Sequence, residues 1–231
     1  MTTIESKLQA VRQRIAAACK VAGRAPSSVQ LLAVSKTFSA ESVREAAAAG
    51  QTQFGENYIQ EAVAKIAALR GLGVEWHCIG PVQGNKTRLV AEHFDWVQSV
   101  DRLKIAQRLN EQRPGTLAPL QVCIQVNTDG GSNKAGVTPE DLPALAQAIA
   151  GLPRLRLRGL MTIPEPAADF AAACALHRRA AELLQRLQAD GHALDTLSMG
   201  MSADLEAAIH AGSTMVRVGT AIFGTRANTA G

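Results

Sequence analysis

Residues 196–224 read TLSMGMSADLEAAIHAGSTMVRVGTAIFG and place an apolar strand on either side of one short helix. The strands are expected at residues 196–199 and 215–218, and the helix at residues 203–210. Each strand runs directly into a glycine-rich turn. A strand, a helix and a second strand in this order form a βαβ unit, in which the two strands lie parallel. The stretch therefore predicts one edge of a parallel sheet.

The same alternation runs back through the rest of the chain. Further strands are expected at residues 29–34, 52–55, 75–79, 96–100, 121–126 and 157–163. Helical patterns fill residues 40–49, 58–70, 83–93, 102–112, 142–150 and 167–189. Eight strands separated by seven helices is the count of an α/β fold of the (β/α)8 TIM barrel type. The alternative is an open doubly wound sheet, but the first strand lacks the GxGxxG that is typical of that fold.

An extra amphipathic helix is expected at the N-terminus, over residues 2–22. Its apolar side chains recur at helical spacing, at Ile4, Leu8, Val11, Ile15 and Cys19. Thr2 and Glu5 have the spacing of a capping box. Helix caps are also expected at Asn57 and Asp101, and Pro143 predicts a separate turn at residues 139–141. No linker or internal repeat interrupts the pattern, so residues 1–231 are expected to form a single domain.

Composition excludes several classes of function. The 231 residues carry 24 Lys and Arg against 20 Asp and Glu, a formal net charge of +4, and only 3% are aromatic. Few side chains are therefore available for base stacking, and no nucleic-acid surface is expected. No apolar run approaches the roughly 20 residues of a bilayer span, and the N-terminus lacks the apolar core of a signal peptide. These features predict a cytoplasmic protein with no membrane contact.

The four cysteines are widely spaced, with no CxxC and no clustering with histidine. A metal site and a disulfide framework are both disfavoured by this spacing. Cys78 and Cys123 fall in apolar strands and Cys19 and Cys174 on helices, so all four are expected to be reduced thiols.

A lysine ends the first expected strand, in the sequence LLAVSK at residues 31–36. Ser35, Thr37 and Phe38 beside it carry no charge. At the end of a parallel strand the Lys36 ammonium is poorly hydrated, which favours the neutral amine and makes it a nucleophile. A nucleophilic lysine forms a Schiff base with an aldehyde.

Two glycine-rich turns at the far end of the chain form a candidate phosphate cradle. In a barrel, phosphates commonly bind after the seventh and eighth strands. Gly200 and Ser202 follow the seventh, and Gly219 and Thr220 follow the eighth. Ser202 is expected to cap the helix at 203–210, whose free N–H groups attract anions. A Schiff-base lysine together with a phosphate cradle indicates pyridoxal phosphate.

Arg217 is expected to project opposite to Val216 and Val218, beside Lys36, because the first and last strands of a closed barrel are neighbours. One hypothesis is a structural ion pair with Glu56. The functional hypothesis is contact with the pyridine nitrogen of the cofactor. An arginine stays protonated and leaves that nitrogen unprotonated, which weakens the ring as an electron sink.

Other polar residues have two interpretations. Asn57 follows the second strand and either caps a helix or faces the ligand, and His77 is expected to be a hydrogen-bonded core residue. Lys86 and Arg88 form either a basic rim or solvated helix ends. Lys134, in the glycine-rich loop 129–136, is a second candidate amine for an aldehyde.

Five blocks of this sequence resemble one family, the pyridoxal phosphate homeostasis proteins (the YggS/PROSC family). They are AVSKT at 33–37, FGENYIQE at 54–61, WHCIGPVQGNK at 76–86, RGLMTI at 158–163 and LSMGMSADLEAAIHAGSTMVRVGTAIFGTR at 197–226. The resemblance implies a barrel similar to the N-terminal domain of alanine racemase. It places the cofactor lysine at Lys36 as an internal aldimine, phosphate contacts at Ser202, Gly219 and Thr220, and the ring-nitrogen contact at Arg217. At Phe38 the chain departs from relatives that carry a lysine there, which changes the charge beside Lys36.

The resemblance implies a protein of intracellular vitamin B6 balance that binds the cofactor, limits free aldehyde and possesses no settled enzyme activity. Apo-enzymes that use pyridoxal phosphate are its implied partners. Racemisation in the related enzymes needs a tyrosine from a second, β-rich domain of a partner subunit. Here only residues 225–231 follow the barrel pattern, so a monomer is expected, and the one tyrosine, Tyr58, is a poor substitute.

Three other functions stay open at this stage. A weak amino-acid racemase would accelerate exchange of the substrate α-proton with solvent. A Schiff-base aldolase for phosphorylated sugars would use Lys36 on the substrate directly, and would be colourless. A purely structural barrel lysine does not account for both glycine-rich turns.

Overall fold

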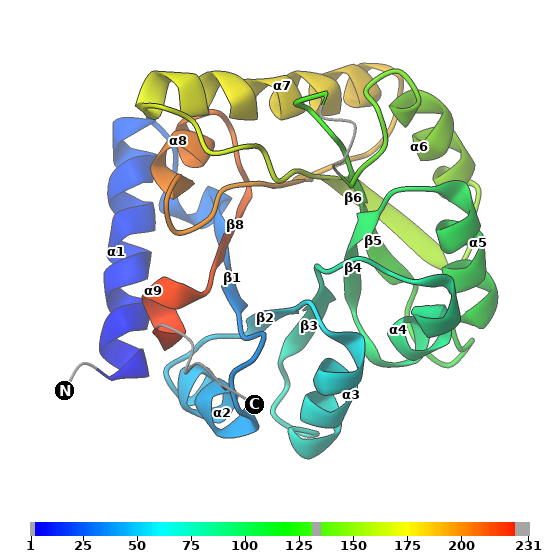
Figure 1. Ribbon diagram of the computed structural model, residues 1–231, viewed down its shortest axis with the longest axis horizontal. Coiled ribbons are helices and arrows are strands. Elements are labelled where there is room, and N and C mark those ends of the chain that lie inside the picture. Colours follow the sequence, from blue (N-terminus) through cyan, green and yellow to red (C-terminus); the bar gives the residue numbers. More distant parts are fainter. Residues whose placement is uncertain (1–2, 131–134, 225–231) are drawn as a thin grey trace.

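Eight parallel strands close into a barrel in chain order, with β8 paired to β1 (Figure 1). The structure is a computed structural model that describes residues 3–130 and 135–224. The strands are β1 (Gln30–Val34), β2 (Gln53–Glu56), β3 (Glu75–Cys78), β4 (Trp96–Val100), β5 (Leu120–Gln125), β6 (Leu155–Met161), β7 (Thr196–Ser198) and β8 (Met215–Val218). The predicted (β/α)8 barrel is confirmed, and the open-sheet alternative is wrong.

Helices surround the strands on the outside of the barrel (Figure 1). They are α1 (Ile4–Val21), α2 (Ala40–Ala48), α3 (Ile59–Ala68), α4 (Thr87–His93), α5 (Leu103–Gln112), α6 (Leu142–Ala150), α7 (Phe170–Ala189), α8 (Leu205–His210) and α9 (Thr220–Phe223). Short 3-10 turns occupy Pro26–Ser28 and Gly84–Lys86, so the helix expected at 83–93 is preceded by a tighter turn. The predicted extra helix is α1, which packs against α2, α8 and α9.

Three of the predicted helix caps are wrong by one residue. Thr3, not Thr2, caps α1, because its hydroxyl accepts from the backbone N–H of Ser6 at 3.1 Å. The cap positions of α3 and α5 are Tyr58 and Arg102, without a side-chain cap bond, instead of Asn57 and Asp101. At α5 the Asp101 carboxylate instead accepts a hydrogen bond from the Arg102 guanidinium at 2.7 Å. Pro143 lies in the first turn of α6, as expected of a proline.

Alternation along each strand divides the side chains between two environments. Outward side chains such as Ala33, Phe54 and Val97 pack with the buried faces of the helices in the main apolar core. The predicted apolar face of α1 belongs to that core. Inside the barrel, Trp96 packs with two inward residues of β5 and β6 in a small separate cluster. The barrel interior therefore has room for polar side chains as well.

The four cysteines are buried free thiols, as predicted. Among the described residues, no group of three or more His, Cys, Asp or Glu has the arrangement of a metal site. In that same part of the chain, none of the helices combines the length and apolar character that a bilayer crossing requires.

Candidate functional site

The residues that the sequence predicts for a ligand site lie at the carboxyl ends of four neighbouring strands. Lys36 follows β1 and Asn57 follows β2, while the two glycine-rich turns follow β7 and β8. Closure pairs β1 with β8 in the register Leu32–Arg217 and Ala33–Val218, which brings Lys36 and the second turn to the same place. Carboxyl ends of strands in a barrel form the face where ligands bind.

A buried cation fixes the turn that carries Lys36. The Lys65 ammonium, from α3, donates to the carbonyl of Ser35 at 2.9 Å and contacts the Glu56 carboxylate at 2.6 Å. It also contacts Glu61 at 3.1 Å, and Glu61 accepts from the backbone N–H of Thr37 at 2.8 Å. Both neighbours of Lys36 are therefore held by the Lys65 cluster, which we define as Lys65, Glu56 and Glu61.

Backbone strain marks the same turn. Thr37 has φ of 67°, and among the described residues no other non-glycine residue has a positive φ. A β-branched residue in this region costs about 1–3 kcal/mol and persists only where its surroundings impose it. The bond from Thr37 to Glu61 is one such restraint.

Glu56 has its partners within the Lys65 cluster, so the predicted alternative of an Arg217–Glu56 ion pair is wrong. Burial raises the pKa of Glu56, although Lys65 and the Ser35 hydroxyl, which donates at 2.6 Å, act in the opposite direction. Sequence reasoning missed Lys65. Its signal was a lysine at the spacing of the buried positions Ile59 and Ala62 on one helix face.

The turn after β7 is shaped by Gly200 and Asp204. Gly200 has φ of 94°, and a Cβ there would lie 2.4 Å from the Cβ of Ala208. The Asp204 carboxylate accepts from the backbone N–H of Met201 at 2.7 Å and lies 2.9 Å from His177 Nε2. Burial acts to raise the pKa of Asp204, but the bonds from His177 and Met201 outweigh it and lower the pKa.

Ser202 is not the predicted helix cap. Asp204 occupies the cap position and α8 begins at Leu205, because the Asp204 side chain closes the preceding turn on Met201. Ser202 lies half-buried within this turn, and its carbonyl accepts from Arg14 at 3.1 Å. It remains at the candidate site, but on the loop and not on the helix.

The turn after β8 lies directly against β1. A Cβ at Gly219 would lie 3.1 Å from the carbonyl oxygen of Val34, so a larger residue would push the two strand ends apart. Gly219 is the cap position of α9 and Thr220 its first residue. The first N–H groups of a helix have no partner within it. Phe38 stacks on Phe223 at 5.0 Å, which joins the β1 loop to α9.

Arg217 projects into the barrel and is only 4% exposed. Its Nη1 donates to the Ser198 hydroxyl and its Nη2 to the carbonyl of Thr162, both at 2.8 Å. No carboxylate of the described residues forms an ion pair with it. Burial lowers the pKa of Arg217 to about 10, so the group stays protonated at neutral pH. Two of the five guanidinium N–H groups are thus used by the protein.

Asn57 is held by backbone contact. A Cβ at Gly80 would lie 2.3 Å from the carbonyl oxygen of Asn57, so only glycine permits this approach. The Asn57 side-chain oxygen is buried and has no partner among the described residues. A buried polar atom without a partner costs about 1–3 kcal/mol, which a ligand donor would recover.

The remaining candidates do not join the site. His77 is a buried residue with hydrogen bonds to Glu75 and Gln98, the core role that was expected. Arg88 is exposed and lies 3.7 Å from Glu92, consistent with a solvated helix end. Lys134 lies outside the described residues. Sequence reasoning also missed Gln98, whose signal was a glutamine in the middle of the expected strand WVQSV at 96–100.

Comparison with known proteins decides the family. The model of the family described as "Alanine racemase, N-terminal domain" matches residues 6–227. The pyridoxal phosphate homeostasis protein of Pseudomonas aeruginosa is 61% identical over 226 residues, covering 98% of this chain and 97% of that protein. The chain belongs to the pyridoxal phosphate homeostasis protein family. The Escherichia coli member is 54% identical over 229 residues, covering 98% of each chain.

Solved structures agree with this assignment. PipY of Synechococcus elongatus, in a structure with PLP bound, superposes with a TM-score of 0.83 at 39% identity, covering 96% of this chain and 100% of that one. Alanine racemase of Corynebacterium glutamicum superposes with a TM-score of 0.70 at 17% identity, covering 96% of this chain and 63% of that one. At that identity the second match shows a shared fold alone.

We predict that Gly200→Ala destabilises the protein by about 3 kcal/mol. A left-handed alanine costs about 1–2 kcal/mol, and the clash with Ala208 adds about 1–3 kcal/mol. Gly191→Ala is the matched control, because Gly191 has the same φ of 94° with nothing within 4 Å of the added Cβ. Urea unfolding measures both variants. Equal losses at the two positions would contradict the close approach to α8.

We predict that Lys65→Met lowers the free energy of unfolding by about 3 kcal/mol, because it leaves Glu56 buried without its cation. Arg88→Met, which removes an exposed partner of Glu92, should change it by no more than about 0.5 kcal/mol. Urea unfolding of both variants checks the contrast. A Lys65→Met protein as stable as Arg88→Met would show that the Lys65 cluster does not restrain the turn.

Proposed function

We propose that this chain binds pyridoxal 5'-phosphate covalently through Lys36 and acts in pyridoxal phosphate homeostasis without a catalytic reaction of its own. The observation that carries the proposal is the meeting of Lys36, Arg217 and two glycine turns at one end of a closed barrel. The family assignment and the PLP-containing structure of PipY support the same ligand.

The residues present fit this group. When bound, pyridoxal phosphate supplies an aldehyde, an aromatic ring with a basic nitrogen, and a phosphate. Lys36 offers the primary amine, on a turn that the Lys65 cluster restrains from both sides. Asn57 offers a buried oxygen that lacks a donor among the described residues.

The two glycine turns form the proposed phosphate cradle. Gly219 and Thr220 present first-turn N–H groups of α9, and these attract anions. Gly200 and Ser202 come from the neighbouring strand end, where Ser202 adds a hydroxyl. Because the turn after β8 adjoins β1 and the turn after β7 lies at the next strand end, a phosphate held there leaves the rest of the ligand within the barrel mouth.

Arg217 is the proposed partner of the ring nitrogen. Three of its N–H groups make no bond to the described residues, and the group remains protonated at neutral pH. A donor that keeps its proton leaves the ring nitrogen unprotonated, which weakens the ring as an electron sink. This property supports a binding role over strong carbanion chemistry. In addition, Tyr58, the chain's one tyrosine, is 53% exposed at the start of α3.

In this proposal the chain acts as a monomeric, cytoplasmic carrier that exchanges pyridoxal phosphate with apo-enzymes. Support comes from the half-buried position of Lys36 at the barrel mouth, where solvent and other molecules have access. Storage and release both require attachment that water can reverse.

We predict that borohydride reduction after incubation with pyridoxal phosphate places a pyridoxyl group on Lys36, mapped by peptide mass spectrometry. Lys36→Ala should fold normally and lose the adduct. Lys104→Ala, which removes an exposed lysine of α5, should keep it. An adduct elsewhere with Lys36 unmodified would favour a different amine, with Lys134 first. Absence of any adduct would favour the Schiff-base aldolase.

We also predict that the loaded protein does not accelerate exchange of the α-proton of small amino acids in deuterated water, followed by proton NMR. The reason is the protonated Arg217 at the proposed ring nitrogen. Lys36→Ala gives the background rate. Exchange well above that background would identify a racemase-like enzyme.

A further inference from the structure

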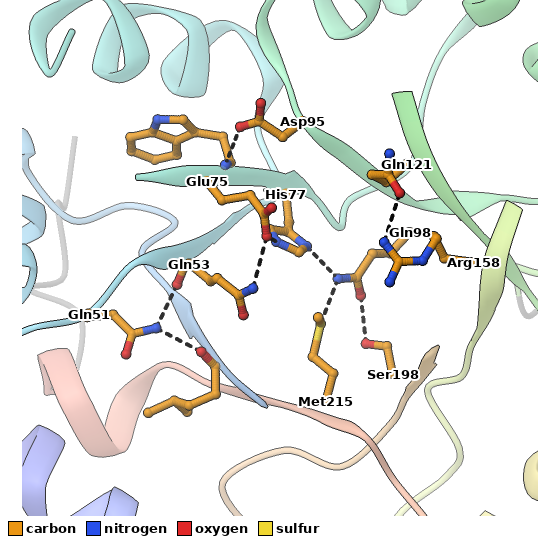
Figure 2. Close-up of polar contacts among 12 residues, drawn as sticks. Gln51, Gln53, Glu75, His77, Asp95, Gln98, Gln121, Arg158, Ser198 and Met215 are labelled. Carbon is orange, nitrogen blue, oxygen red and sulfur yellow. Dashed lines mark hydrogen bonds and ion pairs between the residues drawn. The ribbon is translucent and has the colours of Figure 1, made fainter. Parts of the chain in front are cut away.

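A continuous chain of hydrogen-bonded polar side chains crosses the barrel interior from Arg217 to Glu75, and Figure 2 shows the part from Ser198 through Gln98 and His77 to Glu75. Arg217 Nη1 lies 2.8 Å from Ser198 Oγ, which lies 2.6 Å from Gln98 Oε1. Gln98 Nε2 lies 2.9 Å from His77 Nδ1, and His77 Nε2 lies 2.9 Å from Glu75 Oε1. The chain links the mouth of the barrel to the opposite end, where Glu75 begins β3.

The three middle members are fully buried. Ser198, Gln98 and His77 have no exposed surface, and His77 stacks on Trp96 at 5.1 Å. Burying polar groups in a barrel interior costs free energy unless every one of them is hydrogen-bonded. Here each side chain uses both a donor and an acceptor, so the cost is offset only while the chain is complete.

The two charged ends allow a single arrangement of protons. A guanidinium only donates, so the Ser198 oxygen accepts from Arg217, and its hydroxyl donates to the Gln98 carbonyl. The Gln98 amide then donates to His77 Nδ1. The neutral ring therefore carries its proton on Nε2 and donates to the Glu75 carboxylate. Every donor in the chain points from Arg217 toward Glu75.

Rotating the Gln98 amide by half a turn breaks this order. Its carbonyl would then face His77 Nδ1 and demand a proton there, which leaves the Nε2 lone pair against the Glu75 carboxylate. Burial acts to raise the pKa of Glu75, but the interactions with His77 and the bond from Gln53 act together against it and the net pKa is lowered, so Glu75 is ionised at neutral pH. Burial lowers the pKa of His77, which favours the neutral ring.

The Glu75 carboxylate, at the end opposite Arg217, has a further hydrogen bond. Gln53 donates to the same Glu75 oxygen at 2.9 Å (Figure 2). At the near end, Arg217 has only neutral partners among the described residues, Ser198 and Thr162. Among the residues that the structure describes, Ser198 is thus the one side chain that ties the guanidinium to the rest of the barrel interior. The direction in which its other N–H groups face depends on this bond together with the bond to the Thr162 carbonyl.

We propose that Ser198, Gln98 and His77 are positioning residues that hold Arg217 against the ring nitrogen, with Glu75 at the opposite end fixing the order of the donors. The part concerning the ring rests on the proposed function; the order of the donors does not. Hydrogen-bond partners that orient metal-binding side chains typically change affinity by about tenfold or more, and we expect an effect of that order for the partners of Arg217.

The first experiment compares Ser198→Ala with Ser213→Ala. Ser213 is an equally buried serine whose hydroxyl contacts backbone carbonyls only, at Leu197, Met199 and Met215. We expect Ser198→Ala to keep the adduct on Lys36, to bind pyridoxal phosphate about tenfold more weakly and to shift the absorption band of the bound cofactor. We expect Ser213→Ala to keep the wild-type band. A lost hydroxyl that matters only for stability leaves the band unchanged in both.

The second experiment reads the His77 tautomer by nitrogen-15 NMR in protein without cofactor. We expect a neutral ring protonated on Nε2 in the wild type. Gln98→Glu should move a proton to Nδ1, because a carboxylate oxygen then faces that nitrogen, while the Ser198 hydroxyl retains its acceptor. Gln98→Glu also tests the donor order if Ser198→Ala fails to fold.

The outcomes distinguish the donor order, the positioning role of Ser198 and the proposed function. A wild-type ring protonated on Nδ1 overturns the donor order. Matching bands and affinities for Ser198→Ala and Ser213→Ala, with Lys36 still loaded, overturn the positioning role and leave the proposed function standing. A wild-type protein that fails to load Lys36 overturns the proposed function, and with it the role of Arg217 toward the ring.

Discussion

Closure of the sheet between β1 and β8 is the constraint on which the rest of the structure depends. The residues that it joins are about 180 positions apart in the chain, and the register pairs Ala33 with Val218. Without that pairing, Lys36 and the turn at Gly219 would lie at opposite edges of an open sheet. Closure is also what encloses a barrel interior, so the buried polar chain exists only because the sheet has no free edge.

Two buried cations near the mouth are stabilised in different ways. Lys65 lies outside the strands, between sheet and helix, and has carboxylate partners within reach. Arg217 lies inside the barrel and has neutral partners among the described residues. The first arrangement is an ion-pair cluster that shapes a loop. The second leaves three guanidinium N–H groups without a partner among the described residues, and the proposed function assigns these groups to the ligand.

The barrel fold of this chain is shared with alanine racemase. The match covers 63% of that enzyme, so the comparison extends to the barrel and not to the remainder of the racemase. In the proposed function, an arginine at the ring nitrogen that keeps its proton favours holding the cofactor over using it as an electron sink.

The sequence by itself determined the barrel, its N-terminal helix and the strand ends that carry Lys36, Arg217 and the glycine turns. These follow from local periodicity and from the rule that parallel strands direct their carboxyl ends to one face. It did not determine the caps of α1, α3, α5 and α8, because a single side-chain contact shifts the residue at which a helix begins. At α8 this contact is the hydrogen bond from the Met201 N–H to Asp204. Only the tertiary structure showed that Lys65 secures the Lys36 turn and that Gln98 joins Ser198 to His77. Those contacts join residues from different strands and helices, and their partners are chosen by distance in space, which no spacing along the chain encodes.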